Sequence, residues 1–403
     1  MKRFMKLTAA AAAAMLLAAC GTGQTGGGGG GDGDNTDKPY RIVVSGGVSA
    51  PGVMADLSGT SINATKAAVE DVNDNGGIAG RKIELVVVDD AGDPTTAVTK
   101  LREEINGKGV DAYLNSGPST IANATLPILT QNKILSFNIG PTAESSDPSA
   151  HPMNFDLSPG PAEYLAGFMV ELEKTGYKKV GIIHGSTAYG QTFGKMAADM
   201  LPKEGYEVVG KQEYDSAALD MTPQLQSLQS SKPEVLIFDG YGAPVGYVLQ
   251  SKEKLGWDVP MLANNSVAST SIVSQPPPDG VLGTNQVKGL KMQVAKSIKH
   301  DPNAENVNHA VELMKKQGPI KTTLVQAYNW DAPHLIAAAA DKVGNADNAE
   351  ELAKALEDPE VQEKAESAMI SRYNFTAESH GPNVSGEEFI FVEPSEVKDG
   401  QFQ

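Results

Sequence analysis

The sequence predicts an α/β fold of two lobes, each built on a doubly wound parallel sheet. From Pro39 onward, short apolar runs alternate with amphipathic helical patterns, which predicts parallel strands with helices on both faces. The alternation stops and restarts near "FDLSPGPAEY" (155–164), where proline and glycine break the chain. The rest of the 403-residue chain is also too long for one ordinary core, so two lobes are expected.

The N-terminal segment differs from this pattern. Lys2, Arg3 and Lys6 precede an apolar run over 7–19 that is too short to span a bilayer, which predicts a signal peptide over 1–19. The single cysteine, Cys20, follows at once in "LLAAC", which resembles the lipobox of bacterial lipoproteins and implies lipidation of that residue. An ordinary signal peptide with an incidental cysteine is the alternative. The glycine-rich stretch within 20–38 is expected to be a flexible tether.

The first alternating run contains four expected strands. "RIVVSG" begins it, and a helix follows in which Ala64, Ala68 and Val72 share one face and Gly76-Gly77 form the stop. Asp93 and Pro94 are expected to cap and begin the next helix. The strands are expected over 41–46, 82–90, 111–117 and 134–138, with a further helix ending at Asn132.

The second run repeats this rhythm after the break. We expect strands over 179–185, 206–210, 234–240 and 259–265, with helices ending at Lys174, Leu201 and Leu255 and one beginning near Thr222. After residue 287 the pattern is mostly helical. One long helix is expected over 321–343 and another over 349–369, and "EEFIFVE" (387–393) is expected to close the chain as a strand.

Charge and motif content exclude several classes of function. A formal net charge of −17 argues against nucleic acid or an anionic membrane face as a partner. The six histidines are scattered, and neither a His-Glu-x-x-His nor a Gly-x-Ser-x-Gly motif is present. Asp89-Asp90 could suggest metal binding or acid–base work, but capping at a strand end is favoured. We therefore expect a binding protein without catalytic residues, metal or cofactor, and keep a hydrolase as an alternative.

Three stretches carry a family resemblance. "AAVEDVNDNGGIAGRKIELVVVDDAGDP", "VGIIHGSTAYGQTF" and "FTAESHGPN" are similar to sequences of solute-binding proteins of the branched-chain amino acid (Leu/Ile/Val) type, the lipid-anchored or periplasmic receptors of ABC importers. The resemblance implies a type I periplasmic binding fold, whose two lobes are joined by three crossover strands, here near Leu157, Gly283 and Tyr373. It implies one lobe over 39–157 and 285–372 and a second over 158–284 and 373–403.

The resemblance also implies a ligand site between the lobes. The serine-rich loop that holds a ligand carboxylate corresponds to "SGPSTI", the loop that holds the polar head to "NIGPTA", and the second-lobe aromatic positions to "TAYG" and "FDGYGA". Each of these matches could instead be a cap, a turn or a core residue. The candidate ligand-binding residues are Leu57, Ser119, Thr120, Pro141, Thr142, Tyr189, Asp239, Tyr241 and Asn265.

One departure bears on the ligand. Amino acid receptors of this type carry a glutamate for the ligand ammonium where this sequence has Asn265, and a neutral amide cannot supply a charge-assisted bond. Either Asp239 substitutes, or the ligand is an amide, a urea-like molecule or an aromatic or aliphatic carboxylate. The loops "DDAGDP" and "NSGPST" also lack the cysteines that often form a disulfide in the family.

The expected partners follow from the resemblance. An exported, membrane-anchored monomer would deliver a small-molecule ligand to an ABC permease with its ATPase subunits. A ligand sensor of the same fold that signals through a separate membrane partner is the alternative.

Overall fold

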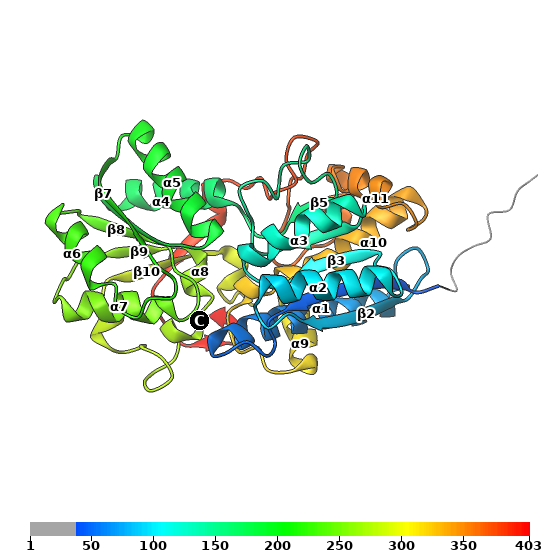
Figure 1. Ribbon diagram of the computed structural model, residues 1–403, viewed down its shortest axis with the longest axis horizontal. Coiled ribbons are helices and arrows are strands. Elements are labelled where there is room, and N and C mark those ends of the chain that lie inside the picture. The colour runs from blue at the N-terminus through cyan, green and yellow to red at the C-terminus, as the bar shows by residue number, and fades with distance from the viewer. Residues whose placement is uncertain (1–37) are drawn as a thin grey trace, which may run out of the picture. The chain divides into compact units, whose positions relative to one another are not determined.

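A computed structural model describes residues 38–403 (Figure 1). The predicted signal peptide, Cys20 and the tether up to residue 37 lie outside the described residues. Within the described part, no helix combines the length and the apolar character needed to cross a membrane.

The first sheet has five parallel strands in the order β2-β1-β3-β4-β5. Its strands are β1 (Tyr40–Gly46), β2 (Ile83–Asp89), β3 (Ala112–Asn115), β4 (Leu135–Asn138) and β5 (Asn154–Asp156). The helices between them are α1 (Val53–Asp74), α2 (Pro94–Asn106) and α3 (Ser119–Gln131). We call this sheet and the helices that cover it the first lobe.

Strand β1 is central to the first lobe and is buried along its whole length. Because side chains alternate along a strand, Ile42 and Val44 pack in one core cluster with residues of α1, while Val43 packs on the other face with Leu101 of α2. The continuous apolar run in this strand therefore reflects burial on both faces, as a parallel sheet requires.

The second sheet has six strands in the order β11-β10-β9-β8-β6-β7. All neighbours are parallel except β10 and β11. The strands are β6 (Lys179–Gly185), β7 (Glu207–Tyr214), β8 (Val235–Phe238), β9 (Met261–Ala263), β10 (Leu290–Ala295) and β11 (Phe389–Val392). The helices are α4 (Pro161–Thr175), α5 (Ala188–Met200), α6 (Thr222–Ser230), α7 (Pro244–Lys254) and α8 (Asn265–Ala268).

Helices cover both faces of the second sheet, and we call the whole the second lobe. Phe168 of α4 and Phe193 of α5 share a core cluster with Ile182 of β6. Leu228 of α6 and Val248 of α7 pack in a different cluster, with Ile183 from the other face of β6. Figure 1 shows α4 and α5 on one side of these strands and α6 and α7 on the other.

The two later lobe boundaries expected from the sequence are wrong. Strand β10 pairs with β9, so the chain stays in the second lobe past residue 285 and passes to the first lobe over 296–304, not near Gly283. Tyr373 donates a hydrogen bond to Asp331 of the first lobe, and Phe375 makes an edge-to-face contact with Phe155, so the chain reaches β11 of the second lobe over 381–388, not near Tyr373. The first passage runs from the end of β5 at Asp156 to the start of α4 at Pro161.

The two long helices expected near the C-terminus are each interrupted. The first becomes two short 3-10 turns, η6 (Leu324–Gln326) and η7 (Tyr328–Trp330), followed by α10 (Asp331–Val343). The second becomes α11 (Ala349–Leu356) and α12 (Pro359–Lys364), because Asp358 caps a new helix that begins with proline. The remaining elements are α9 (Glu305–Gln317), β12 (Val397–Lys398) and β13 (Gln401–Phe402).

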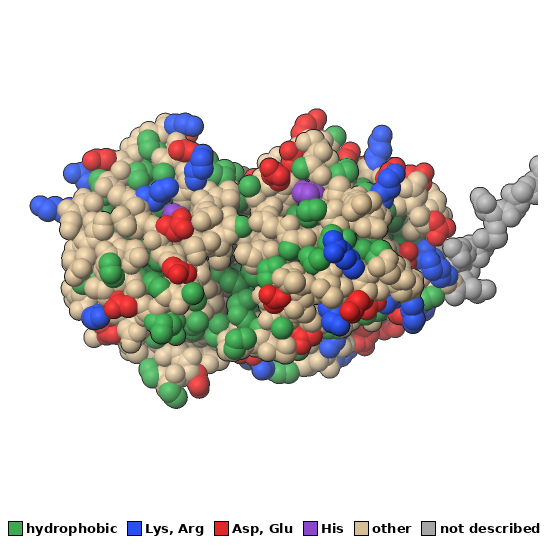
Figure 2. Space-filling model, viewed as in Figure 1, with side chains coloured by type: hydrophobic (Ala, Val, Ile, Leu, Met, Phe, Trp, Pro, Cys, Tyr) green, Lys and Arg blue, Asp and Glu red, His purple; other side chains and the backbone are tan. Residues whose placement is uncertain are grey.

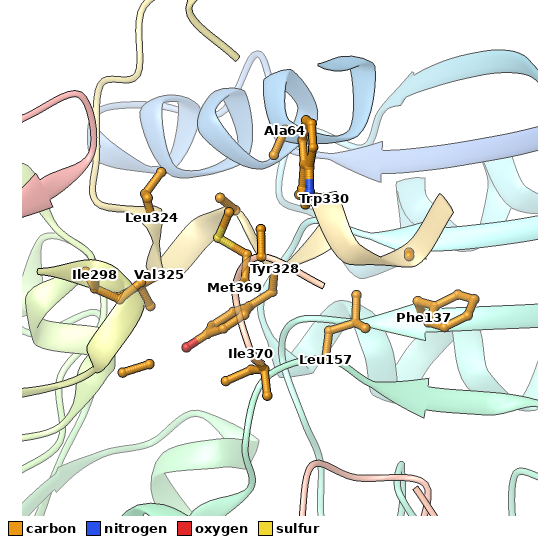
Figure 3. Close-up of a cluster of buried hydrophobic side chains, with 14 of the residues drawn as sticks. Ala64, Phe137, Leu157, Ile298, Leu324, Val325, Tyr328, Trp330, Met369 and Ile370 are labelled. Atoms are coloured by element: carbon orange, nitrogen blue, oxygen red, sulfur yellow. The ribbon is translucent and has the colours of Figure 1, made fainter. Parts of the chain in front are cut away.

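The interrupted segment runs through the centre of the molecule. Figure 3 shows Tyr328 next to Met369 and Ile370, with Val325 and Ile298 to one side of it and Leu157 to the other. Leu157 and Ile298 lie on passages between the lobes. Trp330 lies against Ala64 of α1 in the same view. Tyr328 and Trp330 are both buried, so this segment joins the first-lobe core to the region where the chain changes lobe.

A buried arginine holds the point where the described chain begins. Arg81 donates hydrogen bonds to the backbone carbonyls of Lys38 (2.8 Å) and Pro39 (3.0 Å) and lies over the ring of Tyr40. It also forms an ion pair with Asp347 at 3.1 Å, which ties the loop before α11 to the same place. The start of β1 is thereby fixed at the edge of the first sheet where the strands begin.

Candidate ligand-binding site

A cavity lies where the strands of both sheets end. Its wall is formed by residues that follow β3, β4, β5, β6, β8 and β9, together with η6. Carboxyl ends of strands in open α/β sheets are the usual place for a ligand. The empty space between the wall atoms is about 580 Å³, a figure that includes open solvent at the mouth of the cavity.

The first-lobe wall is made by two loops in close contact. Ser119 begins α3, and Gly140 and Pro141 follow β4. A side chain at Gly140 would place its Cβ 2.8 Å from the backbone nitrogen of Ser119, which is too close for any L residue without backbone movement. Glycine at this position therefore lets the two ligand loops pack directly on each other.

A row of buried amides and one carboxyl group holds these loops. Each residue of the row ends a strand: Asn115 ends β3, Asn138 ends β4 and Asp156 ends β5. Asn115 donates to Asn138 (2.8 Å), and Asn138 donates to Asp156 (3.1 Å). The same two asparagines accept hydrogen bonds from the backbone N–H groups of Gly117 (2.8 Å) and Gly140 (3.0 Å). The row thus fixes both cavity loops to the sheet.

Asn138→Ala should lower both stability and ligand affinity. It leaves Gly140 N–H and one buried amide of Asn115 without an acceptor, so we expect a loss of about 2–3 kcal/mol in the free energy of unfolding. Urea unfolding and ligand titration measure the two effects. The matched control is Asn132→Ala, which truncates an exposed asparagine at the end of α3. Equal losses in the two variants would contradict this role for the row.

The second-lobe wall contains the buried carboxyl group of Asp239. It follows β8 and accepts hydrogen bonds from the side chain of Asn264 (2.6 Å) and from the backbone N–H of Gly185 (3.2 Å). Burial raises the pKa of Asp239 to about 6, although these two hydrogen bonds act in the opposite direction. No lysine, arginine or histidine is among the described residues that line the cavity, so Asp239 is the single charged group in its wall.

Two tyrosines and one contact between the lobes complete the cavity. Tyr189, at the start of α5, and Tyr241, after β8, supply aromatic surface. The backbone N–H of Tyr189 donates to the hydroxyl of Ser119 at 3.1 Å, which joins the two lobes. A second link joins the hydroxyl of Thr323 to the carbonyl of Ala268 at 3.0 Å. The described state is therefore one in which the lobes touch around the cavity.

The structure brings six of the nine residues expected from the sequence to the cavity. These six are Ser119, Pro141, Tyr189, Asp239, Tyr241 and Asn265. Thr120 is exposed, and Leu57 is fully buried in the core away from the cavity wall. The Thr142 hydroxyl accepts the backbone N–H of Ser145 at 3.1 Å and caps its own turn.

Sequence reasoning missed several residues of the wall. Ser158 lies on the first passage between the lobes, close to the proline–glycine break, which was a usable signal. Val325 and Gln326 belong to η6, which lies inside the stretch expected to be one continuous helix. The error in that helix therefore concealed two cavity residues.

Features that suggested other chemistry have structural roles in the described residues. Asp89 accepts backbone N–H groups of Ser49 and Ala91, and Asp90 accepts that of Gly92, so this pair caps loops. In the part of the chain that the structure describes, no cluster of three or more histidine, cysteine, aspartate or glutamate residues could hold a metal ion. On the face in Figure 2, acidic and basic side chains are interspersed, without a continuous basic surface.

Comparison with known proteins gives a consistent result. The family model described as periplasmic binding protein matches residues 39–387. "Leu/Ile/Val-binding protein homolog 3" of Brucella melitensis is 26% identical over 344 residues, which is 84% of this chain and 89% of that protein. The Leu/Ile/Val-binding protein of Escherichia coli K12 is 22% identical over 323 residues, or 78% of this chain and 82% of that protein.

Solved structures show the same fold. A type 1 periplasmic binding protein from Bordetella pertussis aligns with a TM-score of 0.75 and 22% identity, covering 90% of this chain and 98% of that chain. A solute-binding protein of an ABC transporter from Rhodopseudomonas palustris, in complex with benzoate, aligns with a TM-score of 0.71 and 17% identity, covering 90% of this chain and 94% of that chain. At these identities the likeness concerns the fold alone.

Proposed function

This chain belongs to the periplasmic binding protein family, type I, and we propose that it captures an amino acid-like zwitterion for an ABC importer. Proteins of this family bind solutes outside the cytoplasm and are not enzymes. We further propose that Cys20 carries a lipid anchor and that the protein, as a monomer, delivers its ligand to a permease with its ATPase subunits.

One observation carries the choice of ligand class. Asp239 is the single charged side chain in the cavity wall, and no cation of the described residues accompanies it there. A ligand ammonium group would supply the missing positive charge beside the buried carboxyl group. Benzoate-like or aliphatic monoanions would instead bring a second negative charge to the same cavity. The charge of the wall therefore favours a zwitterion over a carboxylate.

The opposite wall suits the ligand carboxylate. Helix α3 begins at Ser119, beside the cavity, and its N-cap residue Pro118 provides no side-chain cap. The first backbone N–H groups of a helix have no partner within the helix and carry partial positive charge. With the Ser119 hydroxyl they form a suitable place for a carboxylate. Asp239 and the start of α3 belong to different lobes, so a zwitterion would bridge them.

The proposed anchoring and delivery rest on the N-terminal segment and on the family. The lipobox-like "LLAAC" supports attachment of Cys20 to a membrane, and the glycine-rich stretch after it supports a flexible link. Solved relatives of the same fold are described as ABC transporter solute-binding proteins. Capture by the two lobes followed by docking on a permease is consistent with both.

A thermal-shift screen tests the ligand class. The full chain, purified in detergent and freed of carried-over ligand by unfolding and refolding, is mixed with zwitterionic amino acids, short amides, urea, benzoate and aliphatic carboxylates. A ligand at about one hundred times its dissociation constant should stabilise the chain by roughly 2.7 kcal/mol. We expect only zwitterions to raise the melting temperature. Stabilisation by benzoate or another carboxylate, and by no amino acid, would refute the proposal.

A further inference from the structure

Two buried amide side chains at the cavity wall have no hydrogen-bond partner. Asn265 is 5% exposed and Gln326 is 6% exposed. The side-chain oxygen of Asn265 is fully buried and unpaired, and neither amide forms a side-chain hydrogen bond to any described residue. A buried polar atom without a partner is costly, so the side-chain oxygen of Asn265 needs a physical explanation. Gln326 lies in the same cavity wall, and its amide is free to bind a group in the cavity.

The two amides belong to different lobes but lie in neighbouring elements. Asn265 begins α8 in the second lobe, and Gln326 ends η6, which packs on α1 of the first lobe. The hydroxyl of Thr323, just before η6, donates to the carbonyl of Ala268 at the end of α8. Elements α8 and η6 are therefore in direct contact, and both amides lie in the wall of the same cavity.

We propose that the ligand side chain is a carboxamide that hydrogen-bonds to Asn265 and Gln326. This inference rests on the proposed function and refines it. The proposed function accounts for the ammonium and carboxylate groups of the ligand, and the inference adds the nature of its side chain. Each amide offers one acceptor and two donors, and a carboxamide offers the same complementary set at one carbon. Two protein amides and one ligand amide can thus satisfy one another without any net charge.

Charge and the remaining groups of the wall favour a neutral polar side chain. A side-chain carboxylate would share the cavity with Asp239 and find no cation there. A branched aliphatic side chain would offer no hydrogen-bond partner to Asn265 or Gln326. The hydroxyl of Tyr189 and the side chain of Asn264 are buried next to each other beside this wall. The part of the wall formed by Asn265 and Gln326 is therefore polar, although Ile139 and Val325 give the same cavity some apolar surface.

The consequence is a ligand preference that differs from the names of the curated relatives, which refer to leucine, isoleucine and valine. Sites that hydrogen-bond a polar ligand group discriminate strongly against analogues that lack it, since the buried groups are then left unpaired. Asparagine and leucine have side chains of nearly the same shape. A difference in affinity between asparagine and leucine therefore reports on hydrogen bonding and not on side-chain size.

The experiment titrates the ligand-free full chain in detergent with asparagine, glutamine, leucine and aspartate by calorimetry. We expect asparagine or glutamine to bind at least tenfold more tightly than leucine, and aspartate to bind more weakly than asparagine. Gln326→Leu and Asn265→Leu should each reduce the preference for carboxamide over leucine by about tenfold or more. The matched control is Gln226→Leu on the exposed face of α6, which should leave the preference unchanged.

The outcomes separate this inference from the proposed function. If leucine binds as tightly as both carboxamides, or if neither variant alters the preference, the inference is overturned while the amino acid receptor stands. If no amino acid binds the unchanged chain but another solute does, the proposed function fails and this inference fails with it. The comparison of ligands on the unchanged chain decides the matter even where a variant does not fold.

Discussion

Asp239→Asn should weaken amino acid binding by at least about 30-fold. Truncating one partner of a buried, hydrogen-bonded charge pair costs about 2–5 kcal/mol of binding free energy. The variant removes the charge, and its amide oxygen can still accept from the backbone N–H of Gly185. Its NH2 group can donate to the side-chain oxygen of Asn264 after that amide turns over. Because burial already disfavours the ionised carboxyl group, the ligand-free variant should be as stable as the native chain above pH 6. Titration calorimetry and thermal unfolding measure the two quantities.

The control and the pH profile of this variant make the test specific. Asp199→Asn removes an exposed carboxylate from the same lobe and should leave affinity unchanged. With a pKa of about 6 in the ligand-free protein, Asp239 is mostly ionised at pH 7 and mostly protonated at pH 5. Affinity for an ammonium ligand should therefore fall about tenfold between these values, and Asp239→Asn should abolish that dependence. A native profile that is flat over this range would contradict the assignment.

Asp331→Ala should cause the largest loss of stability, about 4 kcal/mol or more. Asp331 begins α10 and accepts hydrogen bonds from the backbone N–H groups of Ala368 (2.7 Å), Met369 (3.1 Å) and Ile370 (3.3 Å) and from the hydroxyl of Tyr373 (2.6 Å). All of these groups are buried, and each donor left unpaired costs about 1–3 kcal/mol. Denaturant unfolding measures the loss.

A graded series identifies the cause. Tyr373→Phe removes one of the four donors and should cost about 1 kcal/mol. Asp341→Ala truncates an exposed aspartate on the same helix and should change stability by less than about 0.5 kcal/mol. If Asp331→Ala costs no more than Tyr373→Phe, the backbone N–H groups have found other partners and this account of Asp331 is wrong.

The regular part of the fold could be predicted from the sequence because local signals agree there. Strand β6 occurs over the expected 179–185, and α2 begins at Pro94 after the Asp93 cap. The predicted lobe boundary near residue 285 was wrong because β10, with the sequence "LKMQVA", was not recognised as a strand within a stretch expected to be mostly helical. Its place in the second sheet depends on pairing with β9, which is distant in sequence. Asp358-Pro359, by contrast, was a visible stop signal inside the second long helix.

The site was predictable where it follows strand ends. Ser119, Pro141, Tyr189 and Asp239 all lie just beyond strands that the alternation identified. Gln326 could not be found in this way, because η6 follows no strand and reaches the cavity only through packing between α1 and α8. The partnership of Asp239 with Asn264 likewise joins two strand ends whose adjacency depends on the sheet order.

The arginine at the beginning of the described chain has a mechanical consequence. Arg81 grips the carbonyls of Lys38 and Pro39, while its other contacts are to Tyr40, Asp111 and Asp347. A pull on the chain from the N-terminal side is borne first by these side-chain bonds, before the hydrogen bonds between β1 and β2 are loaded. The load therefore enters the first sheet at the end where its strands begin, opposite to the cavity at the strand ends.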